Sequence, residues 1–256
     1  MYRINQAISR MGIATRREAD RLIKDCFVTL NSNLVTDFST LVRIGDIIII
    51  NKKSYKFAPP PLAVYMFNKP VGCITGRSDP NGRPTVFDVI PQKYNKLISI
   101  GRLDYNTQGL LLFTNDGEFA RFMEIPSSDM KRVYSVRAHG FLNPEKYDKI
   151  VSKAREGLVI DGVKYGKVLI RFENAEKIIA TDRRTAKNHN LQVTVFEGKN
   201  NEVRKIMANF GLTVNRLTRR KFGDFFIGGL EGGKMVKAEI PVTTMNEFKK
   251  YLETNN

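Results

Sequence analysis

The chain has 256 residues, 42% of them hydrophobic and 27% charged, a composition typical of a soluble globular protein. No run approaches the roughly 18 apolar residues that cross a bilayer, and the first residues lack the apolar core of a signal peptide. We therefore expect a cytoplasmic protein without membrane contact. The two cysteines and two histidines lie in no metal-ligand spacing, so we expect neither a metal site nor a disulfide framework.

The charge of the chain is strongly positive. Lysine and arginine number 42 against 26 acidic residues, a net charge of +16. A surplus of this size favours a polyanionic partner, because each neutralised phosphate releases a condensed counterion. Charge alone does not separate a nucleic-acid-binding protein from an ordinary basic one, so the motifs must decide.

A run of three prolines, Pro59 to Pro61, predicts a domain boundary. Consecutive prolines join neither a helix nor a central strand, and they form a semi-rigid extended spacer. We predict a first domain over residues 1–56, a linker over 57–62 and a second domain over 63–253, which opens with an apolar strand at 62–67.

Two helices and a small sheet are predicted in the first domain. Apolar residues recur at helical spacing over residues 4–11, and Gly12 ends that helix. Thr15 followed by Glu18 forms a capping box, which begins a second helix that runs to residue 24. Two strand-like runs follow, at 26–30 and 44–50.

Basic residues outnumber acidic ones by ten to five over residues 1–56. Arg16 and Arg17 stand at the start of the second helix, where free backbone N–H groups favour a phosphate. The segments RIN from Arg3, ATRREA at 14–19 and RIGDIIII from residue 43 resemble the small RNA-binding domain first described in the fourth protein of the small ribosomal subunit. The resemblance implies RNA contacts by Arg3, Arg16 and Arg17.

The second domain mixes strands and helices without regular crossover helices. We predict an α+β fold with a mixed, largely antiparallel sheet and a central cleft. Asn143 and Pro144 begin a helix that ends at Gly157, and Thr244 with Glu247 forms a capping box for the last helix. Strand-like runs are predicted at 168–172, 178–180 and 191–196.

The run over residues 98–118 places Arg102 and Asp104 in a polar loop between two apolar strands. An aspartate on such a loop is held rigidly yet stays reachable, as a nucleophile or base requires. A turn-capping role is the ordinary alternative for a loop aspartate. Asp116, by contrast, is predicted to stand at the start of a helix.

Residues 131–140 alternate as a strand, which puts Tyr134 on one definite face. Such a tyrosine is usually part of a core or a sheet surface. An aromatic face can also hold a nucleobase that has left its stack, with about 1–3 kcal/mol per base.

The run over residues 195–224 predicts a helix and a basic groove. Asn200 or Asn201 caps the helix, Gly211 ends it, and Arg204 lies in its first turn, off the apolar stripe. Between residues 199 and 221 there are seven basic residues and one acid. A solvated basic face and an RNA-backbone groove both fit this density.

Taken together, these segments resemble the bacterial ribosomal RNA pseudouridine synthases of the RsuA/RluB family. The resemblance rests on GRLDYNTQGLLLFTND from residue 101, MFNKPVG at 66–72, and EGKNNEVRKIMANFG with RLTRRKFG from residue 197. It covers almost the whole chain in family order and is weakest over 141–190. The segment DPNGRPTVFDVIP from residue 79 and the ending LLLFTND are closer to RluB, which acts on large-subunit RNA.

The resemblance implies that Asp104 is the nucleophile that isomerises a uridine in ribosomal RNA to pseudouridine. Tyr134 would stack on the flipped-out uracil, and Arg204 would pair with Asp104 and keep it ionised. No cofactor is implied, and the expected partner is large-subunit RNA or an assembling ribosomal subunit, bound by a monomer. The residues expected to contact RNA are Arg3, Arg16, Arg17, Lys69, Arg102, Thr107, Lys199, Asn200, Arg216, Arg219 and Arg220. A structural role is the alternative for Lys69.

Two other functions stay open from the residues. A non-catalytic RNA-binding assembly factor would keep the fold but lose Asp104, Tyr134 or Arg204, and all three are present. A glycosidase would need Asp104 and Asp116 to face each other across a sugar-binding cleft.

Overall fold

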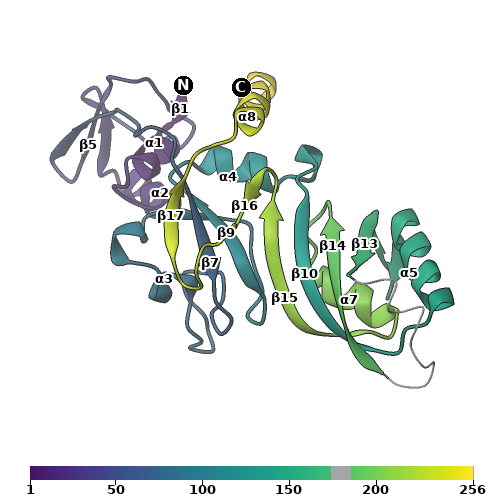
Figure 1. Ribbon diagram of the computed structural model, residues 1–256. Coiled ribbons are helices and arrows are strands. Elements are labelled where there is room, and N and C mark those ends of the chain that lie inside the picture. The colour runs from purple at the N-terminus through teal and green to yellow at the C-terminus, as the bar shows by residue number, and fades with distance from the viewer. Residues whose placement is uncertain (174–185, 256) are drawn as a thin grey trace. The chain divides into compact units, whose positions relative to one another are not determined.

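The computed structural model describes residues 1–173 and 186–255, and it separates into two compact units. The first comprises Met1–Ala63 with Asn115–Gly117, and the second comprises Val64–Thr114 with Glu118–Asn256. Both units mix helices and strands (Figure 1), which confirms the predicted α+β class. Within the described residues, no helix is long and apolar enough to cross a membrane.

The first unit consists of two helices and two small sheets. Strands β1 and β4 pair, and the second sheet has the order β3-β2-β5-β6. Thr15 and Glu18 form the predicted capping box at the start of the second helix. The elements are β1 (Tyr2–Arg3), α1 (Ile4–Arg10), α2 (Arg16–Lys24), β2 (Val28–Leu30), β3 (Asn33–Leu34), β4 (Leu41–Val42), β5 (Ile47–Ile50) and β6 (Lys53–Lys56).

The core of this unit extends one residue beyond the domain boundary that the prolines predict. Phe57, which the sequence assigns to the linker, is fully buried among the helices and strands of the first unit. Its ring meets the edge of the Tyr2 ring at 5.3 Å between centroids. An aromatic ring contributes more by burial in a core than by exposure on a spacer, so Phe57 belongs to the first unit.

A nine-stranded sheet forms the frame of the second unit. Its order is β13-β14-β10-β15-β9-β7-β17, with β16 beside β15 and β8 beside β9. All pairs are antiparallel except β15 with β9, so the sheet is mixed and largely antiparallel, as predicted. The strands are β7 (Val64–Lys69), β8 (Ile98–Ile100), β9 (Gln108–Thr114), β10 (Arg132–Gly140), β13 (Val168–Phe172), β14 (Lys187–Val195), β15 (Thr213–Phe222), β16 (Phe225–Phe226) and β17 (Met235–Ala238), with a separate hairpin of β11 (Leu158–Ile160) and β12 (Val163–Tyr165).

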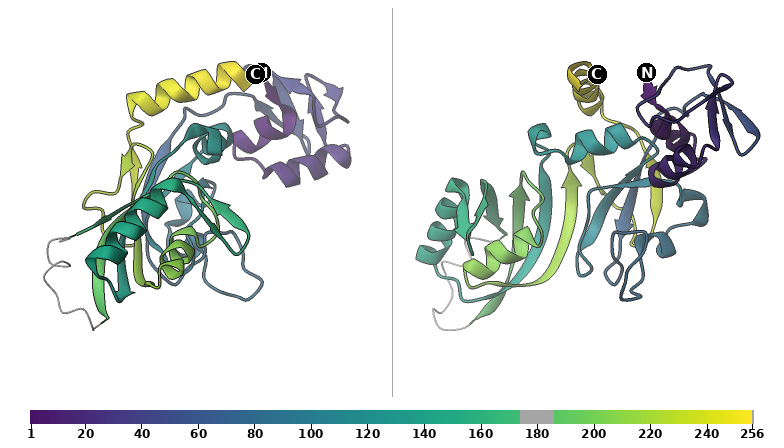
Figure 2. Two further views of the ribbon diagram at one scale, coloured as in Figure 1. Left: turned by 90° about the vertical axis from the view of Figure 1, so that its right-hand side faces the viewer. Right: turned by 180° about the vertical axis from the view of Figure 1, so that it is seen from behind.

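Alternation along β10 decides which side chains enter the core. Tyr134, Val136 and Ala138 are buried, whereas Ser135 and Arg137 are exposed. The inward residues join one core with the apolar faces of α5 and α7, which lie beside these strands (Figure 2). The helices of the chain's second part are α3 (Val86–Val89), η1 (Gln92–Tyr94), α4 (Gly117–Glu124), η2 (Pro126–Ser128), α5 (Pro144–Glu156), α7 (Glu202–Asn209) and α8 (Val242–Asn255).

The predicted helix ends are right for α5 and wrong for α8. Asn143 caps α5 by accepting a hydrogen bond from the Lys146 amide, and Gly157 follows its last turn with φ +89°. The last helix begins at Val242, so Thr244 lies inside it and donates its hydroxyl to Asp224 instead of capping.

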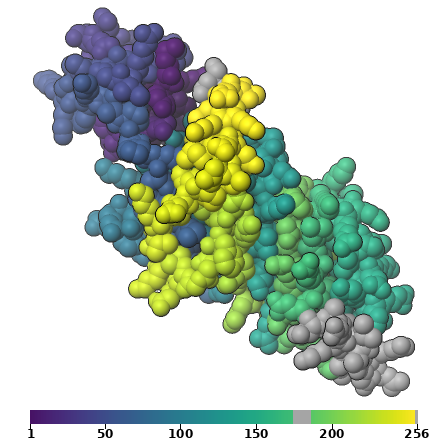
Figure 3. Space-filling view, turned by 45° about the horizontal axis from the view of Figure 1, so that its top comes forward, coloured from purple at the N-terminus to yellow at the C-terminus, as the bar shows by residue number. Residues whose placement is uncertain are grey.

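Helix α8 lies on the surface of the second unit (Figure 3). It is anchored by Phe248, whose ring packs on Phe119 of α4 with 5.1 Å between centroids. The remaining predicted strand, at 178–180, lies outside the described residues.

Candidate active site

A cleft of about 790 Å³ opens in the second unit. It is lined by the loop between β8 and β9, by β10 and β15, and by the segment that leads into α7. Asp104, Tyr134 and Arg219 line it together, although they come from segments far apart in the sequence. The cleft contains acidic as well as basic side chains, so it is not a uniformly positive groove.

The loop that carries Asp104 is held along its whole backbone. Every carbonyl from Arg102 to Thr107 accepts a hydrogen bond, so the loop has little freedom to move and Asp104 is presented from a fixed position. The donors are Arg219 Nη1 to Arg102 (3.4 Å), Thr75 Oγ1 to Leu103 (2.9 Å), Lys69 Nζ and the Thr107 amide to Asp104 (3.1 and 3.0 Å), the Gly72 amide to Tyr105 (3.0 Å), Arg204 Nη2 to Asn106 (2.9 Å) and Lys69 Nζ to Thr107 (3.0 Å).

Lys69 is the central tether of this loop. Its side chain is fully buried at the end of β7, and its ammonium donates to the carbonyls of Pro70, Asp104 and Thr107. Burial lowers the pKa of Lys69, and the nearby Asp104 carboxylate acts in the opposite direction. Of the two roles expected for Lys69, the structural one fits, and the expected RNA contact is corrected, because three backbone carbonyls take its three donors inside the protein.

At its end, the loop lies unusually close to the backbone of β15. Gly109 has φ +106° and pairs with Arg219 in the parallel β9–β15 register. A Cβ atom at this position would stand 2.3 Å from the Arg219 carbonyl oxygen, so no residue larger than glycine fits. The glycine therefore lets the loop with Asp104 lie directly against the strand that carries Arg219.

The sequence did not indicate that Arg219 is a buried residue of the site. It was expected on an RNA-binding surface, yet it is only 2% exposed and lies opposite Tyr134 in the β10–β15 register. Its Nε donates to the Leu110 carbonyl at 2.7 Å, and its buried Nη2 has no hydrogen-bond partner among the described residues. Burial lowers the pKa of this guanidinium, while Tyr134 and Asp104 act to raise it. Its alternation with the apolar Leu217 two residues earlier is the signal that could have placed it inside.

Arg204 does not form the ion pair that was expected with Asp104. No such pair occurs among the described residues, and the guanidinium instead donates to the carbonyls of Val214 (2.8 Å) and Asn106 (2.9 Å). Arg204 therefore holds the loop by a hydrogen bond from its side chain to a backbone carbonyl of the loop. A role for Arg204 in the reaction stays a prediction.

The start of α7 also differs from the prediction. Asn201 occupies the N-cap position in a left-handed conformation, and its side chain makes no capping hydrogen bond. The Glu202 side chain instead accepts a hydrogen bond from the Lys199 amide, in the turn before the helix, at 3.3 Å.

The other residues expected to bind RNA divide by location. Three line the cleft and are exposed: Arg102, Lys199 and Asn200. Thr107 also lines the cleft, but it is buried, and its hydroxyl lacks a hydrogen-bond partner within residues 1–173 and 186–255. Outside the cleft, Arg3, Arg16 and Arg17 are exposed on the first unit, Arg216 is exposed on β15, and Arg220 lies partly buried over the Phe226 ring.

Asp116 offers no second catalytic carboxylate. It precedes α4, as expected of a helix entry, and is 2% exposed. Its carboxylate forms an ion pair with Arg10, and it is not among the residues that line the cleft with Asp104. The carboxylate pair that a glycosidase needs is therefore not formed by these two residues. In the described part of the chain, no cluster of three or more histidine, cysteine, aspartate or glutamate side chains could hold a metal ion.

Comparison with known proteins agrees with the family that the motifs indicated. Residues 63–209 match the family model described as RNA pseudouridylate synthase, and residues 3–48 match the S4 domain. The chain therefore belongs to the RNA pseudouridylate synthase family and carries an N-terminal S4 domain.

Three individual proteins illustrate the similarity. An uncharacterized RNA pseudouridine synthase of Rickettsia bellii is 40% identical over 231 residues, which cover 90% of this chain and 94% of that protein. The ribosomal large subunit pseudouridine synthase B of Xanthomonas axonopodis pv. citri is 36% identical over 228 residues, 86% of this chain but 39% of that longer protein. A crystal structure of a pseudouridylate synthase superposes with a TM-score of 0.61 and 25% identity, over 98% of this chain and 99% of that one.

Proposed function

We propose that this enzyme isomerises a specific uridine of ribosomal RNA, in the large subunit, to pseudouridine. The observation that carries the proposal is the cleft in which a rigidly held Asp104 shares one site with Tyr134 and the buried Arg219. A short acidic side chain on an immobile loop, beside an aromatic ring, suits a reaction on a base that has been turned out of the RNA stack.

Asp104 is the group that acts on the sugar. Isomerisation breaks the bond between uracil N1 and ribose C1′, turns the base, joins C5 to C1′ and releases the proton from C5. The carboxylate assists departure of the base, either by covalent attack at C1′ or by taking a ribose proton. Since the loop backbone is fixed at every carbonyl, the position of the carboxylate is prepared before RNA binds.

The other cleft residues hold the base and its surroundings. The Tyr134 ring, 9% exposed at the cleft, is suited to stack on uracil and to help remove the proton from C5. The unpartnered Nη2 of Arg219 is a donor for a uracil carbonyl or for the departing base. Arg102, exposed at the cleft, suits the gap left by the extruded base or a neighbouring phosphate.

Ribosomal RNA is proposed as the substrate on two grounds. The relative from Xanthomonas is named for the large ribosomal subunit, and the S4 domain with exposed Arg16 and Arg17 offers a second basic surface for RNA. The S4 part is proposed to cover residues 1–57, with Phe57 in its core, joined by a linker at 58–62 to the catalytic part at 63–253. A monomeric state and a cytoplasmic location stay predictions.

The test is release of tritium from ribosomal RNA labelled at C5 of uracil, because only rejoining through C5 frees that label. We expect release by the natural protein and at least a 10³-fold loss, an order-of-magnitude figure, for Asp104→Asn, with RNA binding retained. Assays on large-subunit RNA, small-subunit RNA and assembling particles, run side by side, identify the substrate.

A non-catalytic assembly factor is the competing function. It requires RNA binding without tritium release from any of these substrates, and that result would overturn the proposal. Release from small-subunit RNA alone would retain the chemistry and overturn the choice of subunit.

A further inference from the structure

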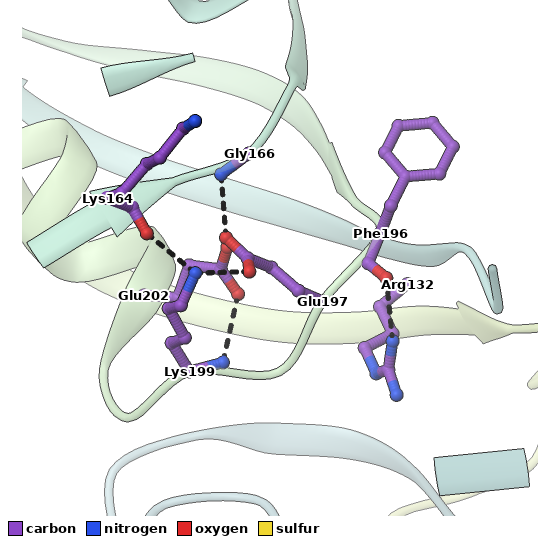
Figure 4. A network of polar contacts seen from close by, with 7 residues as sticks. All are labelled: Arg132, Lys164, Gly166, Phe196, Glu197, Lys199 and Glu202. Carbon is purple, nitrogen blue, oxygen red and sulfur yellow. Dashed lines mark hydrogen bonds and ion pairs between the residues drawn. The ribbon is translucent and has the colours of Figure 1, made fainter. Parts of the chain in front are cut away.

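A network of charged side chains holds the segment Glu197–Asn201, which lines the cleft just before α7 and is called the wall segment here (Figure 4). The Glu197 carboxylate accepts a hydrogen bond from the Gly166 amide at 2.8 Å and forms an ion pair with Lys199. The Lys199 ammonium also donates to the Lys164 carbonyl at 2.6 Å. The network therefore ties the wall segment to the β11–β12 hairpin and to the residue that follows it.

Arg132 braces the same segment from β10. This side chain is 8% exposed, and its guanidinium donates to the Phe196 carbonyl at 3.5 Å. A Cβ atom on Gly198 would stand 3.6 Å from the Arg132 Nε, so the segment lies directly on the guanidinium. Arg132 is two residues from Tyr134, which links the position of the wall segment to the strand that carries the aromatic ring.

Two carboxyl groups meet inside this network. Glu202 is 5% exposed, and its Oε1 is buried without a hydrogen-bond partner in the part of the chain that the structure describes. The Glu202 and Glu197 carboxyl groups lie against each other, where a hydrogen bond between them requires a proton. Two carboxylates in contact cannot both stay ionised at low cost, so one of them binds a proton. Glu197 has both the Lys199 ammonium and the Gly166 amide to stabilise its charge, whereas Glu202 has only the Lys199 amide at 3.3 Å, and the proton therefore belongs on Glu202.

We propose that Glu202 is a positioning residue of the active site, and that its protonated carboxyl group, by donating to Glu197, fixes the wall segment of the cleft. The inference rests on the proposed function for its effect on catalysis, whereas the proton between the two glutamates can be measured without RNA.

The charges around Glu202 agree with this arrangement. Burial and the adjacent Glu197 carboxylate raise the pKa of Glu202 to about 7. The pKa of Glu197 is lowered, since burial acts upward but the hydrogen bonds from Lys199, Gly166 and Glu202 outweigh it. The other charged groups that face Glu202 are Lys199 on the wall segment and Arg132 on β10.

Loss of this proton has a defined consequence. Above neutral pH a second negative charge appears beside Glu197, the hydrogen bond between the carboxyl groups is lost, and the cleft becomes more repulsive to a polyanion. Binding of RNA weakens as the protonated fraction falls. With a midpoint near 7, that fraction changes about tenfold between pH 6 and pH 8, so KM rises by up to about tenfold while kcat changes less.

The first experiment measures the proton directly. Carbon-13 NMR of the glutamate side-chain carboxyl carbons, in the free full-length protein between pH 4 and 9, should contain one glutamate that titrates near pH 7. The signal should vanish in Glu202→Gln and move to lower pH in Glu197→Gln, because the neighbouring charge is gone. The inference is overturned if every glutamate titrates below about pH 5.5, or if the neutral-pH titration persists in Glu202→Gln.

The second experiment tests the link to catalysis through tritium release at pH 6 to 8. Glutamine at position 202 keeps a donor for Glu197 but cannot ionise, so the ratio of the natural protein's KM to that of Glu202→Gln should rise with pH. Glu156→Gln, which changes an exposed glutamate on α5, should follow the natural protein. A ratio that stays constant with pH would overturn the positioning role. Absence of release from every RNA would instead reject the proposed function. The NMR titration alone would then decide whether Glu202 carries the proton.

Discussion

The β8–β9 loop and the wall segment line the same cleft, but they are held by different kinds of interaction. The loop is fixed through its backbone by Lys69, Arg204, Arg219, Thr75 and two amides, on every carbonyl from Arg102 to Thr107. The wall segment is fixed by side-chain charges, with a shared proton proposed between Glu197 and Glu202. Backbone tethers hold Asp104 in one place at any ordinary pH, whereas a carboxyl pair makes its part of the site respond to pH.

The largest loss of stability and activity is expected from Gly109→Ala, which changes the point where the loop lies against β15. The added Cβ would meet the Arg219 carbonyl at 2.3 Å in a backbone with φ +106°, so we expect destabilisation by more than about 3 kcal/mol and loss of activity. Gly162→Ala is the matched control, because it has φ +75° with nothing within 4 Å and should cost about 1 kcal/mol. Urea unfolding of both variants measures the difference, and equal losses would mean that the close approach is unimportant.

Lys69→Met removes the central tether of the loop while keeping the shape of the side chain. The carbonyls of Pro70 and Thr107 lose the Lys69 donor, and the Asp104 carbonyl keeps only the Thr107 amide, so we expect a loss of about 2–4 kcal/mol in unfolding free energy and a fall in kcat of more than about tenfold. Lys153→Met, at an exposed position of α5, should change neither quantity. A stable, fully active Lys69→Met protein would contradict the view that the loop is fixed by these hydrogen bonds.

Stability itself should depend on pH through Glu202. Its pKa is about 7 in the folded protein against 4.5 for an ordinary glutamate, so the folded state binds more protons than the unfolded state between these values. The contribution to stability is therefore fully present below about pH 4.5 and is lost as pH rises to about 7 and beyond. We expect the difference in unfolding free energy between the natural protein and Glu202→Gln to fall over this window. A difference that is flat in pH would place the proton elsewhere.

The smallest effect is expected in the first unit, away from the cleft. Replacing Arg16 and Arg17 together by alanine removes two exposed cations at the N-terminus of α2, so RNA affinity should fall severalfold and the salt slope should decrease by up to about two. The rate of the chemical step at saturating RNA should not change. Lys153→Ala with Arg155→Ala removes the same charge from α5. Equal weakening by both pairs would indicate a general charge effect rather than an RNA contact by the first unit.

Local patterns predicted those parts of the fold that depend on neighbours in the sequence. The Thr15–Glu18 capping box, the Asn143 cap and the alternation along β10 are interactions within a few residues, and all three occur as expected. The end of the first unit at Phe57 and the start of α8 at Val242 were misjudged, because core packing and a hydrogen bond from Thr244 to Asp224 outweighed the local signals.

By itself the sequence determined the family, the two-part organisation, the α+β class and the candidate residues Asp104 and Tyr134, because these depend on long, specific motifs and short-range patterns. Only the tertiary structure decided what the basic residues do. Lys69 and Arg219 look like surface cations in a basic sequence, but pairing of β9 with β15 and the burial of β7 turn them inward, onto backbone carbonyls that need donors. Likewise, Glu202 looks like an ordinary first-turn acid until the fold brings it against Glu197 and away from water, where its charge becomes costly.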